Sequence, residues 1–276
     1  MEHIPLPTKF EFREGSKENE TILTIEPLYP GYGLTIGNAL RRVLLSSLVG
    51  GAVIAVKVKG VDHEFSTIPY VKEDVVDLLL NIKKLHFKIH TDETIRLTLR
   101  AKGEKAVTAA DIETTSDVEV ANLDALICTL TNKNAQLEME FFVKRGRGYF
   151  PTEAREKEKL ELGTIAIDAL FSPIRNVGFS VENVRVGQMT NYNRVILTIE
   201  TDGSISAEDA VRDASQLLVD HFSVLLGGEV SEEVSVSEET EDVEALLSQQ
   251  EDSEEEKEVD ETEKEPKKRG RPRKNA

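Results

Sequence analysis

The sequence predicts an α+β protein built mainly from antiparallel strands, with a few helices and a terminal segment that lacks a core. Apolar and polar residues alternate in several short segments, which is typical of strands with one buried face. Other segments, among them 70–85 and 207–226, have the periodicity and end signals of helices. From Glu229 onward, aromatic residues vanish and acidic residues and serine dominate, which predicts a disordered tail over 229–276.

The first segments predict a hairpin followed by a helix. TKFEFRE (8–14) and TILTIEP (21–27) alternate with period two on either side of the polar turn GSKENE, so we expect two antiparallel strands. Pro27 and Pro30 end these strands, and a helix begins at about Thr35.

The middle of the chain predicts further strands and one helix. AVIAVKVKG (52–60) and VDHEFST (61–67) have the character of strands, and YVKEDVVDLLLNIKKL (70–85) that of a helix. Acidic residues in the first turn of this helix and lysines in its last complement the helix dipole. TIRLTLRAKG (94–103) and AQLEMEFFVKRG (135–146) alternate again, and GRGYFP breaks the second of them.

The last ordered part predicts more strands and a closing helix. Strands with glycine-marked turns are expected over 161–187 and 194–203. A helix from about Ala207 to Leu226 is capped by Ser206, with Asp209 in capping-box spacing. Its apolar stripe is Ala210, Ala214, Leu217, Leu218, Phe222 and Leu225.

The opening helix has more apolar surface than one sheet can cover. Its apolar residues occupy roughly two-thirds of its circumference, whereas a helix on a single sheet needs a stripe of only about 100°. Another helix of this chain or a second copy must cover the remainder. Arg41 and Arg42 interrupt this surface, and two interpretations stay open: they reach carboxylates or carbonyls of a neighbour, or they extend to solvent along apolar stems. The apolar residues are Ile36, Ala39, Leu40, Val43, Leu44, Leu45 and Leu48.

The sequence offers little support for chemistry of its own. The single cysteine, Cys128, excludes an internal disulfide and reads as a small buried residue. Gly31, Gly33 and Gly37 precede a helix, but no strand runs directly into the first glycine, which argues against a nucleotide-binding loop. The five histidines lie in unrelated segments without metal-ligand spacing. We therefore expect no catalytic residue, no metal and no cofactor in this chain.

Several motifs resemble the alpha-subunit family of bacterial DNA-directed RNA polymerase. The resemblance covers residues 1–228, with the motifs in the family's order. The motifs are GYGLTIGNALRRVLLSSLVGGAV, GVDHEFSTIPYVKEDVVDLLLNIKKL, VTAADI, VKRGRGYFP and AIDALFSPIRNVGFSVENVRV.

The resemblance implies a discontinuous dimerisation domain, 1–50 and 172–228, in which an antiparallel sheet packs on two helices. It also implies an inserted, mainly β domain over 51–171 that contacts the large subunits. In this family two copies form a homodimer, on which the beta and beta-prime subunits assemble to transcribe DNA. The implied dimer-interface residues are Ile36, Leu40, Val43, Leu44, Ser47, Leu48, Leu217, Leu218, Phe222 and Leu225.

The same resemblance implies contacts with the large subunits. They come from the NALRR helix, from the HEFST loop, from the GRGY turn and from SPIRNVGFS (172–180), which resembles the stretch that meets beta-prime. For the loop and the turn, an ordinary strand end and an ordinary hairpin turn remain alternatives. The implied residues are Asn38, Arg41, Arg42, His63, Glu64, Phe65, Ser66, Thr67, Gly146, Arg147, Gly148, Tyr149, Ile174 and Arg175.

The tail departs from the family pattern, in which a small DNA-binding domain follows the assembly module. Here 18 acidic residues occupy 229–265, and six basic residues follow within 266–276. The end of the tail resembles the core of an AT-hook, which binds A·T-rich minor grooves. A generic basic end that touches phosphates without sequence preference is the alternative. The speculative DNA contacts are Arg269, Gly270, Arg271, Pro272 and Arg273.

Two other classes of protein compete with the assembly subunit. A stand-alone DNA-binding protein would depend on the basic tail, but the rest of the chain is mildly acidic within a net charge of −17. A nucleotide-dependent enzyme would depend on the weak glycine spacing. The N-terminus has no apolar core typical of a signal peptide, and no apolar run is long enough for a membrane helix, so we expect a cytoplasmic protein without a membrane partner.

Overall fold

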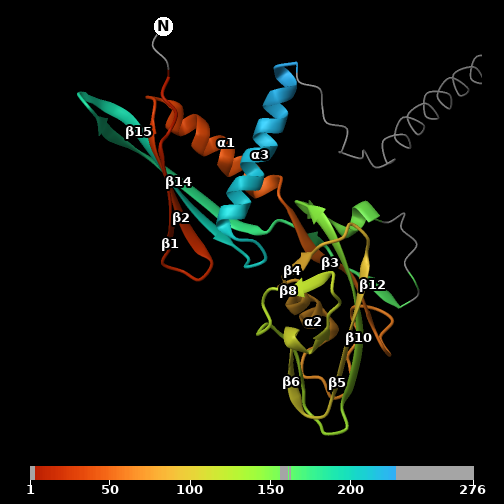
Figure 1. Cartoon of the computed structure of the whole chain (residues 1–276). Helices are drawn as coiled ribbons and strands as arrows, with labels where there is room; N and C mark the ends of the chain where they lie inside the picture. The colour runs from red at the N-terminus through yellow and green to blue at the C-terminus, as the bar shows by residue number, and fades with distance from the viewer. Residues whose placement is uncertain (1–3, 156–160, 162, 228–276) are drawn as a thin grey trace, which may run out of the picture. The chain divides into compact units, whose positions relative to one another are not determined.

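The computed structural model describes residues 4–155, 161 and 163–227. It divides into a compact unit of residues 1–222 and a second unit, Ser223–Ala276, of which only the first residues are described. The described part confirms the predicted α+β class, because it combines mostly antiparallel sheets with three α-helices (Figure 1). The predicted disordered tail, 229–276, lies outside the described residues.

A four-stranded antiparallel sheet joins the two ends of the compact unit. The predicted hairpin is confirmed, with Lys9 opposite Glu26 and Glu14 opposite Thr21. Strands far apart in the sequence are neighbours in the centre of this sheet, where β2 pairs with β15. Its strands, in order across the sheet, are β1 (Lys9–Glu14), β2 (Glu20–Leu28), β15 (Met189–Thr201) and β14 (Ile174–Val186).

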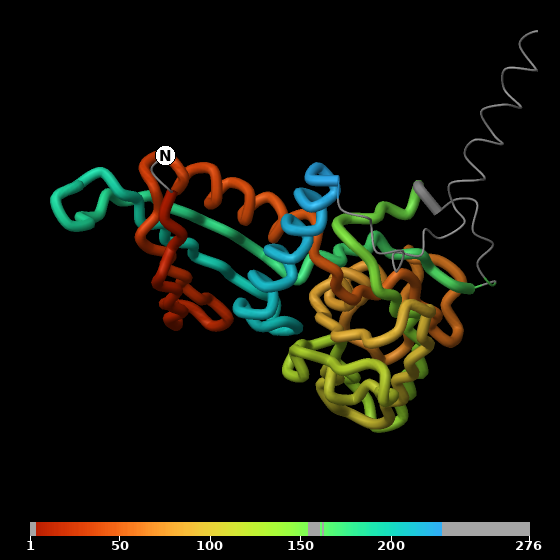
Figure 2. Tube along the Cα trace, turned by 45° about the horizontal axis from the view of Figure 1, so that its top comes forward, coloured from red at the N-terminus to blue at the C-terminus, as the bar shows by residue number. Residues whose placement is uncertain are grey.

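Two helices share a core with this sheet (Figures 1 and 2). Helix α1 (Tyr32–Ser46) begins three residues before the predicted start at Thr35. The reason lies on β15, where the Asn193 side-chain oxygen accepts hydrogen bonds from the backbone N–H groups of Gly31 (2.9 Å) and Gly33 (3.4 Å). These are donors that a helix start leaves without partners, and a residue 160 positions away supplies the acceptor.

Helix α3 (Ala207–Leu225) confirms the predicted closing helix and its cap. The Ser206 hydroxyl accepts a hydrogen bond from the Asp209 backbone N–H at 3.1 Å and donates to the Asp209 carboxylate at 2.7 Å. Ala210 and Ala214 are fully buried, so small side chains bring this helix close to the sheet.

A seven-stranded antiparallel sheet, with helix α2 (Val75–Ile82), surrounds a second core. Strand β10 lies in its centre between β5 and β3. The strands are β7 (Ile112–Glu113), β5 (Ile95–Lys102), β10 (Gln136–Arg147), β3 (Val49–Val58), β4 (Phe87–Ile89) and β8 (Val118–Val120), with β12 (Thr164–Ala166) paired to β3.

Shorter elements complete the described part. Two further ribbons pair β6 (Lys105–Thr108) with β9 (Leu126–Leu130) and β11 (Tyr149–Phe150) with β13 (Ala169–Leu170). Two 3₁₀ turns cover Ala109–Asp111 and Thr152–Arg155. Cys128 is fully buried in the second core, and burial raises its pKa to about 12, which leaves the thiol protonated and unreactive.

Two predictions for the middle of the chain are wrong. Residues 61–67 form a loop rather than a strand, because the chain turns there through a hydrogen bond from the Ser66 N–H to the His63 carbonyl. The helix predicted over 70–85 is shorter. The residues before it are held by strand β9, since the Lys72 N–H donates to the Thr129 carbonyl, and the Asp74 carboxylate caps the helix instead.

Candidate protein-interaction site

An apolar groove lies between α1, α3 and the first two strands. Its volume is about 600 Å³, and we call it the α1–α3 groove. Aromatic side chains from both ends of the compact unit line it, and Phe10 and Phe222 are each 60% exposed. An outward-facing apolar surface of this kind marks an interaction site in a soluble protein. The residues that define it are Phe10, Phe12, Ile36, Ala39, Leu40, Val211, Leu218 and Phe222.

The wide apolar surface of α1 divides into a covered and an open part. Leu40, Leu44 and Leu48 are buried in the chain's own core. Ile36 and Val43 are only half-buried, and Ser47 is half-buried at the end of the helix. The sheet of the same chain therefore covers only part of the arc, which is the shortfall expected from the sequence.

Two glycines explain how closely α1 approaches the sheet. A side chain at Gly37 would place its Cβ 2.6 Å from the ring of Phe179, and one at Gly33 would meet Val181 at 2.8 Å. Together with the Asn193 cap, this packing occupies the positions that a nucleotide-binding loop would offer to a phosphate. Gly33 and Gly37 therefore serve packing, which argues against the nucleotide interpretation.

The predicted interface residues of helix α3 become more exposed towards its C-terminal end. Leu217 and Leu218 are half-buried against the core, whereas Phe222 and Leu225 are exposed. Sequence analysis missed Phe10 and Val219, which are also exposed. Phe10 shares the apolar face of an alternating strand with Phe12, so its apolar character was visible in the sequence but its exposure was not.

The two arginines of α1 are both exposed, as is Asn38. Neither Arg41 nor Arg42 forms an ion pair with any residue the structure describes. A guanidinium group without an internal partner is available to a carboxylate of another chain. Both interpretations of these side chains, contact with a neighbour or extension to solvent, are compatible with this geometry.

The HEFST loop, His63–Thr67, exposes a large apolar side chain. Phe65 is 79% exposed at its centre. Beside it the Ser66 hydroxyl lies 3.2 Å from the His63 ring nitrogen Nδ1, which holds the loop in a turn. Glu64 is exposed and Thr67 follows the turn. An exposed aromatic on a structured loop suits a protein contact.

The GRGY turn has glycines for structural reasons. A side chain at Gly146 would meet the Phe171 ring at 2.8 Å, and Gly148 has a φ of +65°, which favours glycine. Arg147 and Tyr149 on either side of Gly148 are exposed. The turn therefore offers one charged and one aromatic side chain to solvent.

The predicted residues of 172–180 differ in accessibility. Ile174 is buried at 4% exposure, so it is not available to a partner as the chain stands. The Arg175 guanidinium lies 2.6 Å from His86 Nε2, and His86 Nδ1 lies 3.4 Å from the Asp202 carboxylate. This cluster joins the four-stranded sheet to the segment before β4. Burial lowers the pKa of His86; Asp202 opposes this shift and Arg175 adds to it.

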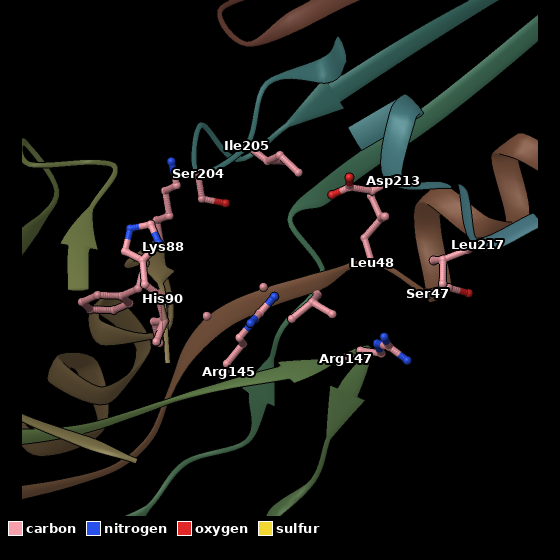
Figure 3. Close-up of a pocket in the computed structure, with 15 residues that line it drawn as sticks. Ser47, Leu48, Lys88, His90, Arg145, Arg147, Ser204, Ile205, Asp213 and Leu217 are labelled. Atoms are coloured by element: carbon pink, nitrogen blue, oxygen red, sulfur yellow. The ribbon is translucent and has the colours of Figure 1, made fainter. Parts of the chain in front are cut away.

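A second cavity, the β3–β4 cleft, has a volume of about 420 Å³. It opens where the start of β3 separates from β4, and α3 forms another wall. In Figure 3, Lys88 and His90 lie on one side, with Asp213 and Leu217 across from them and Arg145 and Arg147 below. Sequence analysis singled out only Arg147 of these charged residues. The residues that define the cleft are Leu48, Gly51, Lys88, Arg145, Arg147 and Asp213.

Three predictions concern metals, membranes and the tail. The described residues contain no group of three or more His, Cys, Asp or Glu side chains placed to hold a metal ion. No helix within the described residues has the length and apolar character needed to span a bilayer. The predicted DNA contacts, Arg269–Arg273, lie outside the described residues.

Comparison with known proteins gives the class and then the family. Residues 56–172 match the family model described as the RNA polymerase Rpb3/RpoA insert domain. Those residues therefore belong to the insert-domain class that the RNA polymerase subunits Rpb3 and RpoA share. A DNA-directed RNA polymerase subunit alpha from Moorella thermoacetica is 48% identical over 220 residues, which are 79% of this chain and 70% of that relative. The chain belongs to the family of DNA-directed RNA polymerase alpha subunits, and it is thus part of a DNA-directed RNA polymerase complex.

Proposed function

We propose that the chain forms a homodimer through the α1–α3 groove and that the dimer is the platform on which the beta and beta-prime subunits assemble. The observation that carries the proposal is an open apolar groove on a helix pair that the chain's own sheet covers only in part. In a two-fold dimer every interface residue is used twice, so Phe222 of each copy fills the partner's groove. Burial of one such side chain contributes about 1.5–3 kcal/mol.

The division of labour follows the two cores. The residues of the four-stranded core belong to 1–50 and 172–228, the proposed dimerisation domain, and those of the second core belong to 51–171. The large-subunit contacts are the exposed cations of α1, the HEFST loop, the GRGY turn and Arg175. The exposure of Asn38, Arg41, Arg42, Phe65, Arg147, Tyr149 and Arg175 supports this assignment, whereas Ile174 is buried and gains no such support. The chain works in the cytoplasm and has no active site of its own; the chemistry belongs to the large subunits.

The dimer is tested with Phe222→Glu in sedimentation equilibrium. A carboxylate in the apolar interface would lose its hydration without a partner, so we expect dimer affinity to fall at least about a hundredfold. Leu123→Glu, the same kind of change at an exposed leucine outside the groove, is the control and should dimerise normally. A wild-type chain that stays a folded monomer at micromolar concentration would refute the proposal.

Assembly is tested with Arg42→Ala in co-expression with both large subunits. We expect the variant to dimerise like the wild type but to yield several-fold less assembled polymerase, because an interfacial charge pair is lost. Arg100→Ala is the control, since Arg100 is an exposed arginine outside every proposed contact. Equal yields for the three proteins would remove Arg42 from the large-subunit surface.

We propose further that the end of the tail contacts A·T-rich DNA upstream of the promoter. The support is the RGRP sequence, in which glycine permits close approach to the groove floor and arginines favour a narrow, negative groove. The acidic segment before it would act as a linker of roughly 40 residues. Deletion of residues 266–276 should abolish protection of upstream A·T tracts in footprints of the assembled polymerase. Unchanged protection would contradict this contact.

A further inference from the structure

The seven-stranded sheet is nearly interrupted between β3 and β4. These strands pair at one position, Gly51 opposite Phe87. On its other side β3 is paired with β10 from Val49 onward. At Val49 and Gly50, β3 is therefore paired along one edge only among the described strands. An unpaired strand edge carries free N–H and C=O groups that another strand can bind.

The β3–β4 cleft opens where the two strands separate. Apolar side chains form part of its lining, and Leu48, Phe87 and Ile89 are all below 10% exposure. Gly50, at the free edge, and Gly51, opposite Phe87, both lack side chains. Both glycines are required by the chain's own packing, since a Cβ would lie 2.0 Å from the Phe171 carbonyl oxygen at Gly50 and 2.7 Å from that of Phe87 at Gly51.

The charged residues around the cleft are mainly basic. Lys88 and Arg147 form no ion pair with any described residue, and Arg145 pairs only with the highly exposed Asp92 at 3.3 Å. Asp213 is the one acidic residue in the described lining. The cleft therefore combines a free strand edge, an apolar lining and an excess of positive charge (Figure 3).

We propose that the β3–β4 cleft binds an extended acidic segment of one of the two large polymerase subunits. The segment adds backbone hydrogen bonds to the free edge of β3, and its carboxylates lie against Lys88, Arg145 and Arg147. A polypeptide fits better than a nucleic acid, because apolar side chains between its carboxylates gain from the apolar lining, whereas a phosphate backbone gains nothing there. The inference rests on the proposed function, since it takes the large subunits as partners.

The experiment places a photo-crosslinking amino acid at position 88 of the full chain, co-expressed with both large subunits. Crosslinked peptides from the assembled polymerase are identified by mass spectrometry. We expect them to come from one stretch of a large subunit that is rich in Asp and Glu. The control carries the crosslinker at the exposed Lys59, at the far end of β3, and should not label that stretch.

A charge variant at Lys88 tests whether the crosslink reflects electrostatic binding in the cleft or only the nearness of the two chains. With the crosslinker at His90, Lys88→Glu should lower the crosslink yield about tenfold, because like charges then face each other, whereas Lys88→Arg should preserve it. Unchanged unfolding midpoints exclude a folding defect, since Lys88 is exposed.

The outcomes distinguish this inference from the proposed function. Assembled polymerase whose crosslinks reach no acidic stretch, or reach DNA or RNA, overturns the cleft proposal alone. The same holds if Lys88→Glu leaves the yield unchanged. A wild-type chain that assembles with neither large subunit overturns the proposed function and the cleft proposal with it.

Discussion

The two cores of this chain differ in how completely the chain covers them. The core around the seven-stranded sheet contains 29 buried apolar residues and has four partly buried ones packed against it. The core around the four-stranded sheet has only 14 buried residues but ten partly buried ones. Four of these partly buried side chains line the α1–α3 groove, namely Phe12, Ile36, Val211 and Leu218. The comparison indicates that the chain itself covers one core, whereas the other leaves apolar surface open to the partner proposed above.

The largest expected effects come from truncating a buried side chain in each core and from varying the protein concentration during unfolding. Phe141→Ala in the closed core and Leu197→Ala in the open core should each cost about 2–5 kcal/mol, since both side chains are fully buried. Unfolding in urea, followed by far-UV circular dichroism, should then show no concentration dependence for the transition of the closed core. The free energy of unfolding of the open core should rise by up to about 1.4 kcal/mol per tenfold increase in protein concentration, because only the folded chain dimerises. Equal concentration dependence of both transitions would remove the distinction.

A smaller effect is expected from Asn193, which ties α1 to the sheet of the open core. Asn193→Ala should destabilise that core by about 1–2 kcal/mol, because two backbone donors lose their acceptor. Amide hydrogen exchange at the start of α1 should accelerate, while exchange in β10 stays unchanged. Asn191→Ala, an exposed residue on the same strand, is the matched control. Faster exchange in both cores would mean that the cap does not act locally.

The smallest effect concerns pH and the link between the two regions at His86. The folded chain lowers the pKa of His86, mainly through burial, so the unfolded chain binds the proton more readily. The stabilising contribution is therefore present above the unfolded pKa of about 6.5 and is lost as pH falls from there towards the lower folded value. His86→Gln should flatten this part of the stability profile, as measured by thermal unfolding between pH 7.5 and 5.5.

The exposed His90, at the end of β4, supplies the control for this titration. His90→Gln should leave the pH profile like that of the wild type. A profile that is unchanged by His86→Gln would show that another group couples the two regions to pH.

Local patterns predicted most elements of the fold. Alternation identified β1, β2, β5, β10 and β15, and the cap at Ser206 marked the start of α3, because these signals lie within a few residues of one another. The errors came from distant contacts. The helix predicted from residue 70 starts later because β9 binds Lys72, and α1 starts earlier because of Asn193. Neither partner can be read from the segment itself.

The candidate site was predictable only where it depends on local sequence. The surplus apolar surface of α1 follows from its own sequence, and the open part of the arc agrees with it. The β3–β4 cleft was not predictable, because Lys88, Arg145 and Asp213 come from three distant segments. Strands β3 and β4 separate beside Gly51, and these side chains line the opening.

The pairing of β2 with β15 determines the order in which the two cores can fold while the chain is being synthesised on the ribosome. Residues 53–167 supply the whole closed core, so it can form as soon as that stretch has emerged. Strand β2 and the start of α1 must wait about 165 residues for β15 and Asn193, which at 5–20 residues per second is a delay of roughly ten to thirty seconds. During that interval the apolar faces of the nascent N-terminal hairpin and helix, which β14, β15 and α3 later cover, remain exposed. The N-terminal segment, which is synthesised first, is therefore the part of the nascent chain most prone to non-native association.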